Sequence, residues 1–125
     1  LYHLVMSNKE TAKKFLQLIS LGHLREAFER FVAPDFIHHN QFAEGDRDSL
    51  AEAMAEAAMS DPVRSFIVKQ SMEEGDRVMT YSHVIKQMVD MAVIHIFRFK
   101  EGKIVELWDL GQPVSQDTPN ENGLF

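Results

Sequence analysis

Cysteine is absent from this 125-residue sequence. Its absence excludes disulfide bonds, cysteine-ligated zinc, iron–sulfur clusters and thiol catalysis, and it fits a reducing compartment, so a cytoplasmic location is expected. With 45% hydrophobic and 26% charged residues, the chain has the composition and length of one globular domain. A domain of this size buries roughly two thirds of its unfolded surface and needs no covalent or metal cross-link.

An excess of positive charge is also missing. The formal net charge is −6, and the 13 Lys and Arg residues are scattered rather than clustered, so no nucleic-acid partner is expected. The apolar runs fall far short of the ~20 residues that a membrane-spanning helix needs, and the N-terminus lacks the layout of a signal peptide. Neither membrane insertion nor export is expected.

Several catalytic motifs do not occur. The sequence contains no Gly-rich phosphate loop, no nucleophile-elbow serine and no dinucleotide fingerprint. Its histidines and acidic residues lack the His-x-Glu-x-x-His or i, i+4 spacing of common metal sites. No metal and no cofactor are therefore expected, and phosphoryl transfer, serine hydrolysis and nicotinamide chemistry lose their usual support.

The first half of the chain has helical periodicity. Ser7 and Glu10 have the spacing of a capping box, and apolar residues then recur at helical intervals up to Gly22. Three helices are predicted: residues 7–22, residues 23–32, which Pro34 would end, and a helix capped by Asp46 or Asp48 that stops before Pro62.

After Pro62 the periodicity becomes that of strands. Gly75 and Gly102 lie in polar breaks that predict tight turns. Strands are predicted over residues 63–72, 78–87, 91–99 and 103–110, in addition to a short early strand at residues 35–40.

Helices followed by antiparallel strands are typical of an α+β domain. We expect three N-terminal helices to cover one side of a strongly curved antiparallel sheet, whose hollow would hold a small apolar molecule. The domain is predicted to span residues 7–112, after a leader or start-site remnant at residues 1–6. Residues 113–125 are predicted to form an extended or flexible tail, which could lie across the mouth of the hollow.

Asp109 is a candidate acid–base residue because of its place in the last predicted strand. Alternation gives this strand two faces, Val105, Leu107 and Asp109 against Ile104, Glu106 and Trp108. If the first set faces the hollow, Asp109 ends an apolar row, where a carboxylate loses hydration and can exchange protons near neutral pH. The alternative is a solvated residue that closes the strand.

Two histidines lie on apolar rows of neighbouring predicted strands. His95 shares its face with Val93, Phe97 and Phe99, and His83 shares its face with Met79, Tyr81 and Ile85. The two rows could adjoin and form one cluster, although a lone histidine on an apolar face is more often a hydrogen-bonded core residue. His38 and His39 face opposite ways, so only one of them can line the hollow.

Two segments have distinctive sequences: FIHHN at residues 36–40, followed by Gly45, and FRFKEGKIVELWDLGQ at residues 97–112. They resemble segments of the SnoaL-like polyketide cyclase family, within the nuclear-transport-factor-2-like superfamily. Residues 75–78 resemble the central hairpin of that family. The resemblance covers nearly the whole chain after residue 7, and the second segment is the more specific.

The resemblance implies a cone-shaped α+β barrel, usually dimeric, whose pocket carries acid–base chemistry in some members and only binds ligands in others. The pocket residues that it implies are His39, Asn40, His83, His95, Trp108 and Asp109. Many relatives have an aspartate at the position of His95 and a histidine at that of Tyr81. Tyr81 and Phe97, beside His83 and His95 on their rows, are also expected to contact the substrate.

The leading hypothesis is a cofactor-independent lyase or isomerase that removes a proton next to the carbonyl of a small apolar molecule, as in aldol condensation, cyclisation or isomerisation. Asp109 would be the base, His95 or His83 the proton partner, and His39 with Asn40 the hydrogen-bonding stabiliser of the enolate oxygen. The alternative is a non-catalytic small-ligand-binding or interaction module of the same fold. In either case a homodimer is expected.

Overall fold

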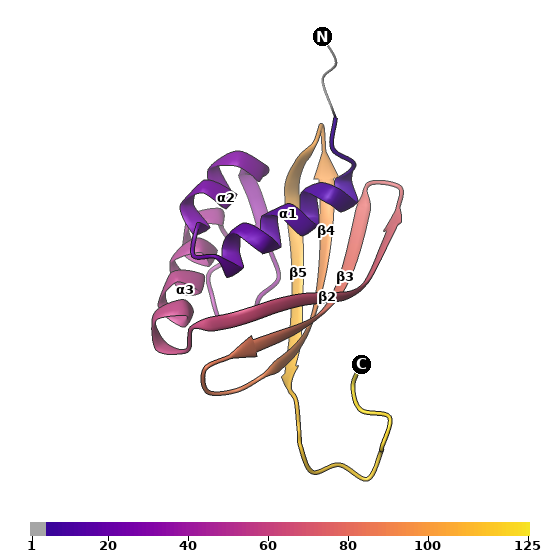
Figure 1. The fold of residues 1–125 in the computed structure, drawn as a ribbon. Helices are drawn as coiled ribbons and strands as arrows, with labels where there is room; N and C mark the ends of the chain where they lie inside the picture. Colours follow the sequence, from indigo (N-terminus) through magenta and orange to yellow (C-terminus); the bar gives the residue numbers. More distant parts are fainter. Residues whose placement is uncertain (1–4) are drawn as a thin grey trace.

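The computed structural model describes residues 5–125 and contains three helices and a five-stranded sheet (Figure 1). The helices are α1 (Asn8–Ser20), α2 (Leu24–Phe31) and α3 (Arg47–Ser60). The strands are β1 (Val32–His38), β2 (Val63–Glu74), β3 (Arg77–Lys86), β4 (Met91–Lys100) and β5 (Lys103–Pro113). The α+β class is confirmed, and most of the predicted leader, residues 1–4, lies outside the described residues.

The starts of helices α1 and α3 follow from side-chain caps. The Ser7 hydroxyl accepts a hydrogen bond from the Glu10 backbone N–H at 3.1 Å, and the Asp46 carboxylate accepts one from the Ser49 backbone N–H at 3.0 Å. Both bonds satisfy N–H groups that the first turn of a helix leaves free. Of the two caps considered for α3, Asp46 is therefore the one used.

The segment around Pro34 differs from the prediction. The second helix ends at Phe31 and β1 begins at Val32, so the strand occupies residues 32–38 rather than 35–40. Pro34 lies inside β1, three residues after the end of the helix, and is tolerated there because β1 is an edge strand, where a missing N–H is acceptable. β1 pairs parallel with β5, so the sheet is mixed rather than wholly antiparallel.

The sheet has the order β1-β5-β4-β3-β2 and is open, with β1 and β2 as its edges. Gly75 and Gly102 have φ angles of 60° and 78° in the turns that join β2 to β3 and β4 to β5. Figure 1 shows the three helices gathered on one side of a strongly bent sheet. The curved sheet and its helical cover are confirmed, but the sheet does not close into the expected barrel.

The core lies between the helices and the inner face of the sheet, which we define as the face turned towards them. Phe15 of α1 packs edge-on against Phe97 of β4, with ring centroids 6.0 Å apart and both rings buried. On β3 the inner row contains Val78, Thr80 and Ser82, each fully buried. This inner face forms the wall of the hollow.

A register shift in β5 changes the predicted alternation. The β4–β5 ladder shifts by one residue, which leaves Val105 without a direct partner. Ile104 and Leu107 are consequently both buried on the inner face, and Asp109 follows Leu107 on that face. Asp109 thus lies on the inner face, one of the two alternatives considered, while Ile104 occupies the inner row in place of Val105.

The C-terminal tail returns to the outer face of the sheet. β5 extends to Pro113, three residues beyond the predicted strand, and residues 114–125 have no helix or strand. The Phe125 ring stacks on the His83 ring at 4.5 Å, and the Tyr81 hydroxyl donates a hydrogen bond to the Leu124 carbonyl. The end of the tail therefore lies on the sheet and not across the mouth of the hollow.

Candidate functional site

A cavity of about 530 Å³ opens where the ends of β3, β4 and β5 meet the loop after β1. Most of its wall is apolar, with Phe66, Val84, Met91 and Val93 among the lining residues. The polar side chains that line it are His39, Asn40, Gln41, Lys86, His95 and Asp109. A few polar groups in a largely apolar cavity are the usual composition of a small-molecule site.

His95 and Asp109 face each other across the β4–β5 ladder, directly in register. The His95 Nε2 atom lies 3.7 Å from the Asp109 Oδ1 atom, which is longer than a hydrogen bond. His95 is only 7% exposed, and this burial lowers its pKa, while the charge of Asp109 acts in the opposite direction. A buried imidazole that is neutral near pH 7 therefore lies beside a partly exposed carboxylate.

Asn40 orients the Asp109 carboxylate. Its side-chain Nδ2 donates a hydrogen bond to Asp109 Oδ2 at 3.0 Å, and its Oδ1 accepts one from the Phe42 backbone N–H at 2.9 Å. Both ends of the amide are thus occupied, which fixes its orientation. Asn40 is placed to position the Asp109 carboxylate, a role different from the predicted stabilisation of an enolate oxygen.

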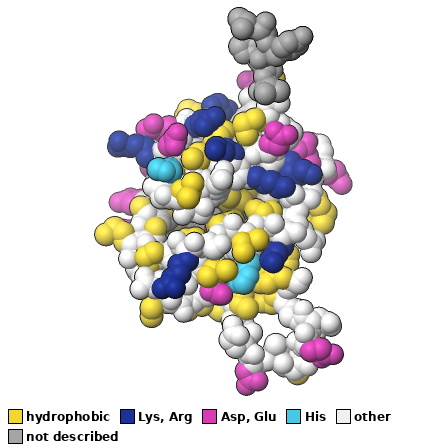
Figure 2. All heavy atoms as spheres, in the orientation of Figure 1, with side chains coloured by type: hydrophobic (Ala, Val, Ile, Leu, Met, Phe, Trp, Pro, Cys, Tyr) yellow, Lys and Arg dark blue, Asp and Glu magenta, His cyan; other side chains and the backbone are white. Residues whose placement is uncertain are grey.

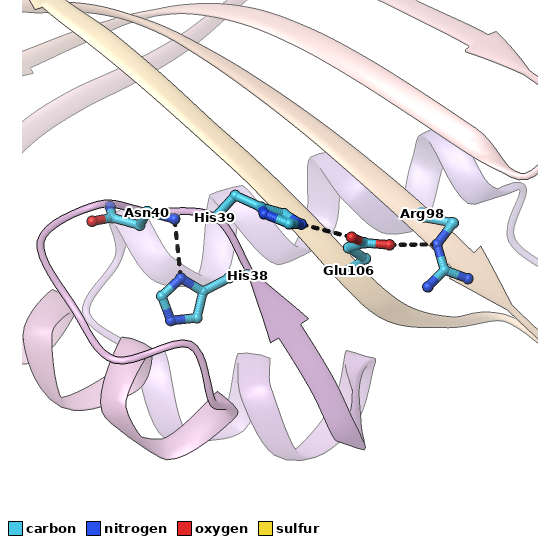
Figure 3. Close-up of polar contacts among 5 residues, drawn as sticks. All are labelled: His38, His39, Asn40, Arg98 and Glu106. Carbon is cyan, nitrogen blue, oxygen red and sulfur yellow. Dashed lines mark hydrogen bonds and ion pairs between the residues drawn. The ribbon is translucent and has the colours of Figure 1, made fainter.

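His38 supports Asn40 from below the loop (Figure 3). The backbone N–H of Asn40 donates to His38 Nδ1 at 3.1 Å, so the His38 Nε2 atom carries the proton and donates to the Glu44 carbonyl. His38 is buried and His39 is exposed, which agrees with the prediction that their side chains point to opposite faces. His38 was not predicted as a site residue, although it lies only two residues before Asn40 in the sequence.

His39 lines the cavity, but its ring joins a second polar group on the outer face of the sheet (Figure 3). Its Nε2 atom lies 2.6 Å from Glu106 Oε2, and Arg98 Nε donates to Glu106 Oε1 at 2.8 Å. The hydrogen bond from His39, followed by that from Arg98, lowers the pKa of Glu106. The His39 ring stacks on Trp108 at 4.9 Å, and Trp108 itself does not line the cavity.

Tyr81 and His83 lie on the opposite face of the sheet. In the β3–β4 ladder His95 pairs with Thr80, whereas His83 pairs with Ala92, so His83 and His95 point to opposite sides. The predicted cluster of His83 with His95 and Asp109 is therefore wrong. His83 instead lies 3.2 Å from an oxygen of Asp90.

Phe97 shares the inner face with His95 but does not line the cavity. Its side chain is fully buried, and its ring lies 5.8 Å from the His95 ring. Phe97 therefore packs against the His95 imidazole and is not placed to touch a ligand in the cavity. Of the predicted site residues, the structure brings together Asn40, His95 and Asp109. His39 also lines the cavity, but its ring contacts Glu106 and Trp108.

Lys86 is a cavity residue that sequence reasoning missed. It lies on β3, two residues after Val84, and its Nζ atom is 3.9 Å from Asp61 Oδ2. The alternation that begins at the buried Val78 places Lys86 on the inner face, so the signal was present in the sequence. Lys86 therefore places its own positive charge in the cavity wall that contains His95 and Asp109.

Two further observations concern residues 5–125 as a whole. None of their helices is long and apolar enough to cross a membrane. They also contain no group of three or more histidine, cysteine, aspartate or glutamate side chains placed to hold a metal ion.

The sequence profile of the SnoaL-like domain family matches residues 12–107. This match spans most of the chain and every strand of the sheet, with β5 covered as far as Leu107. The chain therefore belongs to the SnoaL-like domain family. None of the curated proteins matches the sequence.

Solved structures share the fold at low sequence identity. AclR from Streptomyces galilaeus, described as a candidate hydroxylase, has a TM-score of 0.73 and 21% identity over 84% of this chain and 88% of its own. IdmH from Streptomyces antibioticus, described as a candidate polyketide cyclase, has a TM-score of 0.73 and 21% identity over 86% and 93%. An NTF2-like protein from Cytophaga hutchinsonii has a TM-score of 0.73 and 13% identity over 89% and 95%. These similarities establish the fold alone.

Proposed function

We propose that this protein is a cofactor-independent lyase or isomerase that removes a proton next to the carbonyl group of a small apolar molecule. The observation that carries the proposal is the Asp109 carboxylate, held by Asn40 and faced by the buried His95 in a largely apolar cavity. A carboxylate fixed at the wall of such a cavity is placed to act as a general base.

Each cavity group has a distinct part in the proposed reaction. Asp109 accepts the proton from the carbon next to the carbonyl, and the C–H electron pair moves to form an enolate. Lys86 supplies positive charge for the enolate oxygen, whereas His39 Nε2 is already bound to Glu106. Protonated Asp109 then returns this proton to a carbon of the enolate, which regenerates the carboxylate. His95, neutral and beside Asp109, relays the proton without a net change in its own protonation.

The direct test is hydrogen–deuterium exchange, followed by NMR, at the carbon next to the carbonyl in a panel of cyclic and acyclic ketones. We expect the protein to accelerate exchange, and Asp109→Asn to reduce the acceleration by roughly 10²- to 10⁴-fold, the usual contribution of a general base. Asp35→Asn, at an exposed carboxylate on β1, is the matched control and should change nothing. Unchanged exchange in Asp109→Asn removes Asp109 as the base, and ligand binding without any exchange favours the non-catalytic binding module.

We also propose that the protein acts as a homodimer in the cytoplasm. The homodimer is what the family resemblance implies, and the outer face of the sheet offers an apolar surface for it, with Leu110 65% exposed. The cytoplasmic location rests on the cysteine-free sequence.

A further inference from the structure

A second cavity, of about 450 Å³, lies between helix α1 and strand β2. Figure 2 shows hydrophobic side chains on the floor of the hollow between these two elements. We call this cavity the α1–β2 groove; its apolar lining includes Leu16, Phe66 and Val68, and its charged lining is Glu10, Lys13 and Lys14.

Phe66 separates the α1–β2 groove from the cavity of Asp109 and His95. Its side chain lines both spaces, and its ring centroid lies 6.3 Å from that of His95. Phe66 is only partly buried, and its strand β2 is an edge strand that pairs with β3 alone within the sheet. One aromatic side chain therefore stands between the two spaces.

The groove is positively charged in a protein that is acidic overall. Lys13 and Lys14 line it together with the single carboxylate of Glu10, while the whole chain has a formal net charge of −6. Among residues 5–125, neither lysine forms an ion pair with a carboxylate. Two free ammonium groups beside apolar side chains match a ligand that has an anionic end and an aliphatic body.

We infer that the substrate is an elongated oxo-carboxylic acid that occupies both spaces. Its carboxylate contacts Lys13 and Lys14, its aliphatic chain passes Phe66, and its carbonyl lies beside Asp109 and His95. The position of the carbonyl rests on the proposed function. The binding of a linear carboxylate past Phe66 does not depend on the proposed function. An experiment can therefore contradict either proposal and leave the other intact.

The test of the passage at Phe66 is a series of straight-chain carboxylates from hexanoate to dodecanoate, with affinities measured by calorimetry. Each methylene buried in an apolar cavity raises affinity by about three- to fourfold. We expect this rise to continue to dodecanoate in the unsubstituted protein and in Phe66→Leu, and to stop at a shorter chain in Phe66→Trp, whose larger ring fills the passage. An unchanged length dependence in Phe66→Trp, with the fold retained, overturns the inference.

The test of the charged end compares dodecanoate with dodecanol. Lys13→Gln combined with Lys14→Gln should weaken dodecanoate by about fivefold and leave dodecanol unchanged, because two partly exposed charge contacts are lost. Lys100→Gln, at an exposed lysine of β4, is the matched control. Equal effects on acid and alcohol, or no effect on either, overturn the inference. Asp109→Asn separates the two proposals: it should lose ketone exchange while affinity still rises with carboxylate chain length. Ketone exchange by the parent without dodecanoate binding removes only this inference.

Discussion

Burial and a neighbouring carboxylate act on His95 in opposite directions. Burial disfavours the imidazolium, Asp109 favours it, and burial is the larger effect, so the pKa of His95 falls below its ordinary value near 6.5. His95 Nδ1 is also buried without a hydrogen-bond partner among the described side chains. The sequence predicted that His95 lies on an apolar row with Phe97. It did not predict which strand face would carry His83, because that depends on the register between β3 and β4.

The lowered pKa of His95 predicts a specific loss of stability in weak acid. The unfolded chain binds the His95 proton more tightly than the folded one, so the free energy of unfolding decreases as the pH falls below about 6.5 and continues to decrease down to the folded pKa. His95→Gln removes this contribution. Urea unfolding at pH 7 and pH 5 should show that the variant loses less stability than the parent over this range. The exposed His23 gives the control variant His23→Gln, and equal losses in His95→Gln and its parent would contradict the prediction.

Among the elements, those with strong local signals were predicted most accurately. Helix α1 and the turns at Gly75 and Gly102 follow from a cap, an amphipathic pattern and positive φ angles, all of which are local. β1 was placed three residues late because Pro34 breaks a helix as well as an inner strand, and only the sheet order shows that β1 lies at an edge. The shift in β5 likewise depends on pairing with β4, which no window of sequence contains.

Glu106 connects strands β4 and β5 to the segment that follows β1. Its pKa is lowered by hydrogen bonds from His39 and Arg98, so its contribution to stability is present at neutral pH and is lost as the pH falls through the lowered folded pKa. Glu106→Gln should therefore reduce the free energy of unfolding by about 1 kcal/mol at pH 7, and the difference from the parent should shrink towards pH 3. Urea unfolding of the variant and of the parent at both pH values measures this difference in the free energy of unfolding. Glu52→Gln, on the exposed side of α3, is the control, and a difference that stays constant with pH would show that Glu106 is not ionised in these contacts.

For the whole molecule, the open sheet leaves two different faces. The inner face is covered by the helices and forms the cavity, whereas the outer face is covered only in part, where Phe125 lies on His83 and Tyr81. The sequence predicted a curved sheet with a hollow, but the position of the tail depends on contacts between residues more than 40 positions apart. Tyr81 and His83 are thus better understood as residues of the outer face than of the cavity.

The outer face leads to the prediction of a homodimer. Ile94 lies on it between Tyr81 and Leu110 in the strand register, within an apolar surface that no helix covers. Light scattering should give twice the monomer mass of 14.4 kDa. Ile94→Glu should give a monomer, because a charge buried in an apolar interface is strongly unfavourable. Met59→Glu, at an 85% exposed site on α3, should remain dimeric. A monomeric parent would contradict the homodimer, whereas a dimer that Ile94→Glu leaves intact would place the interface on another surface.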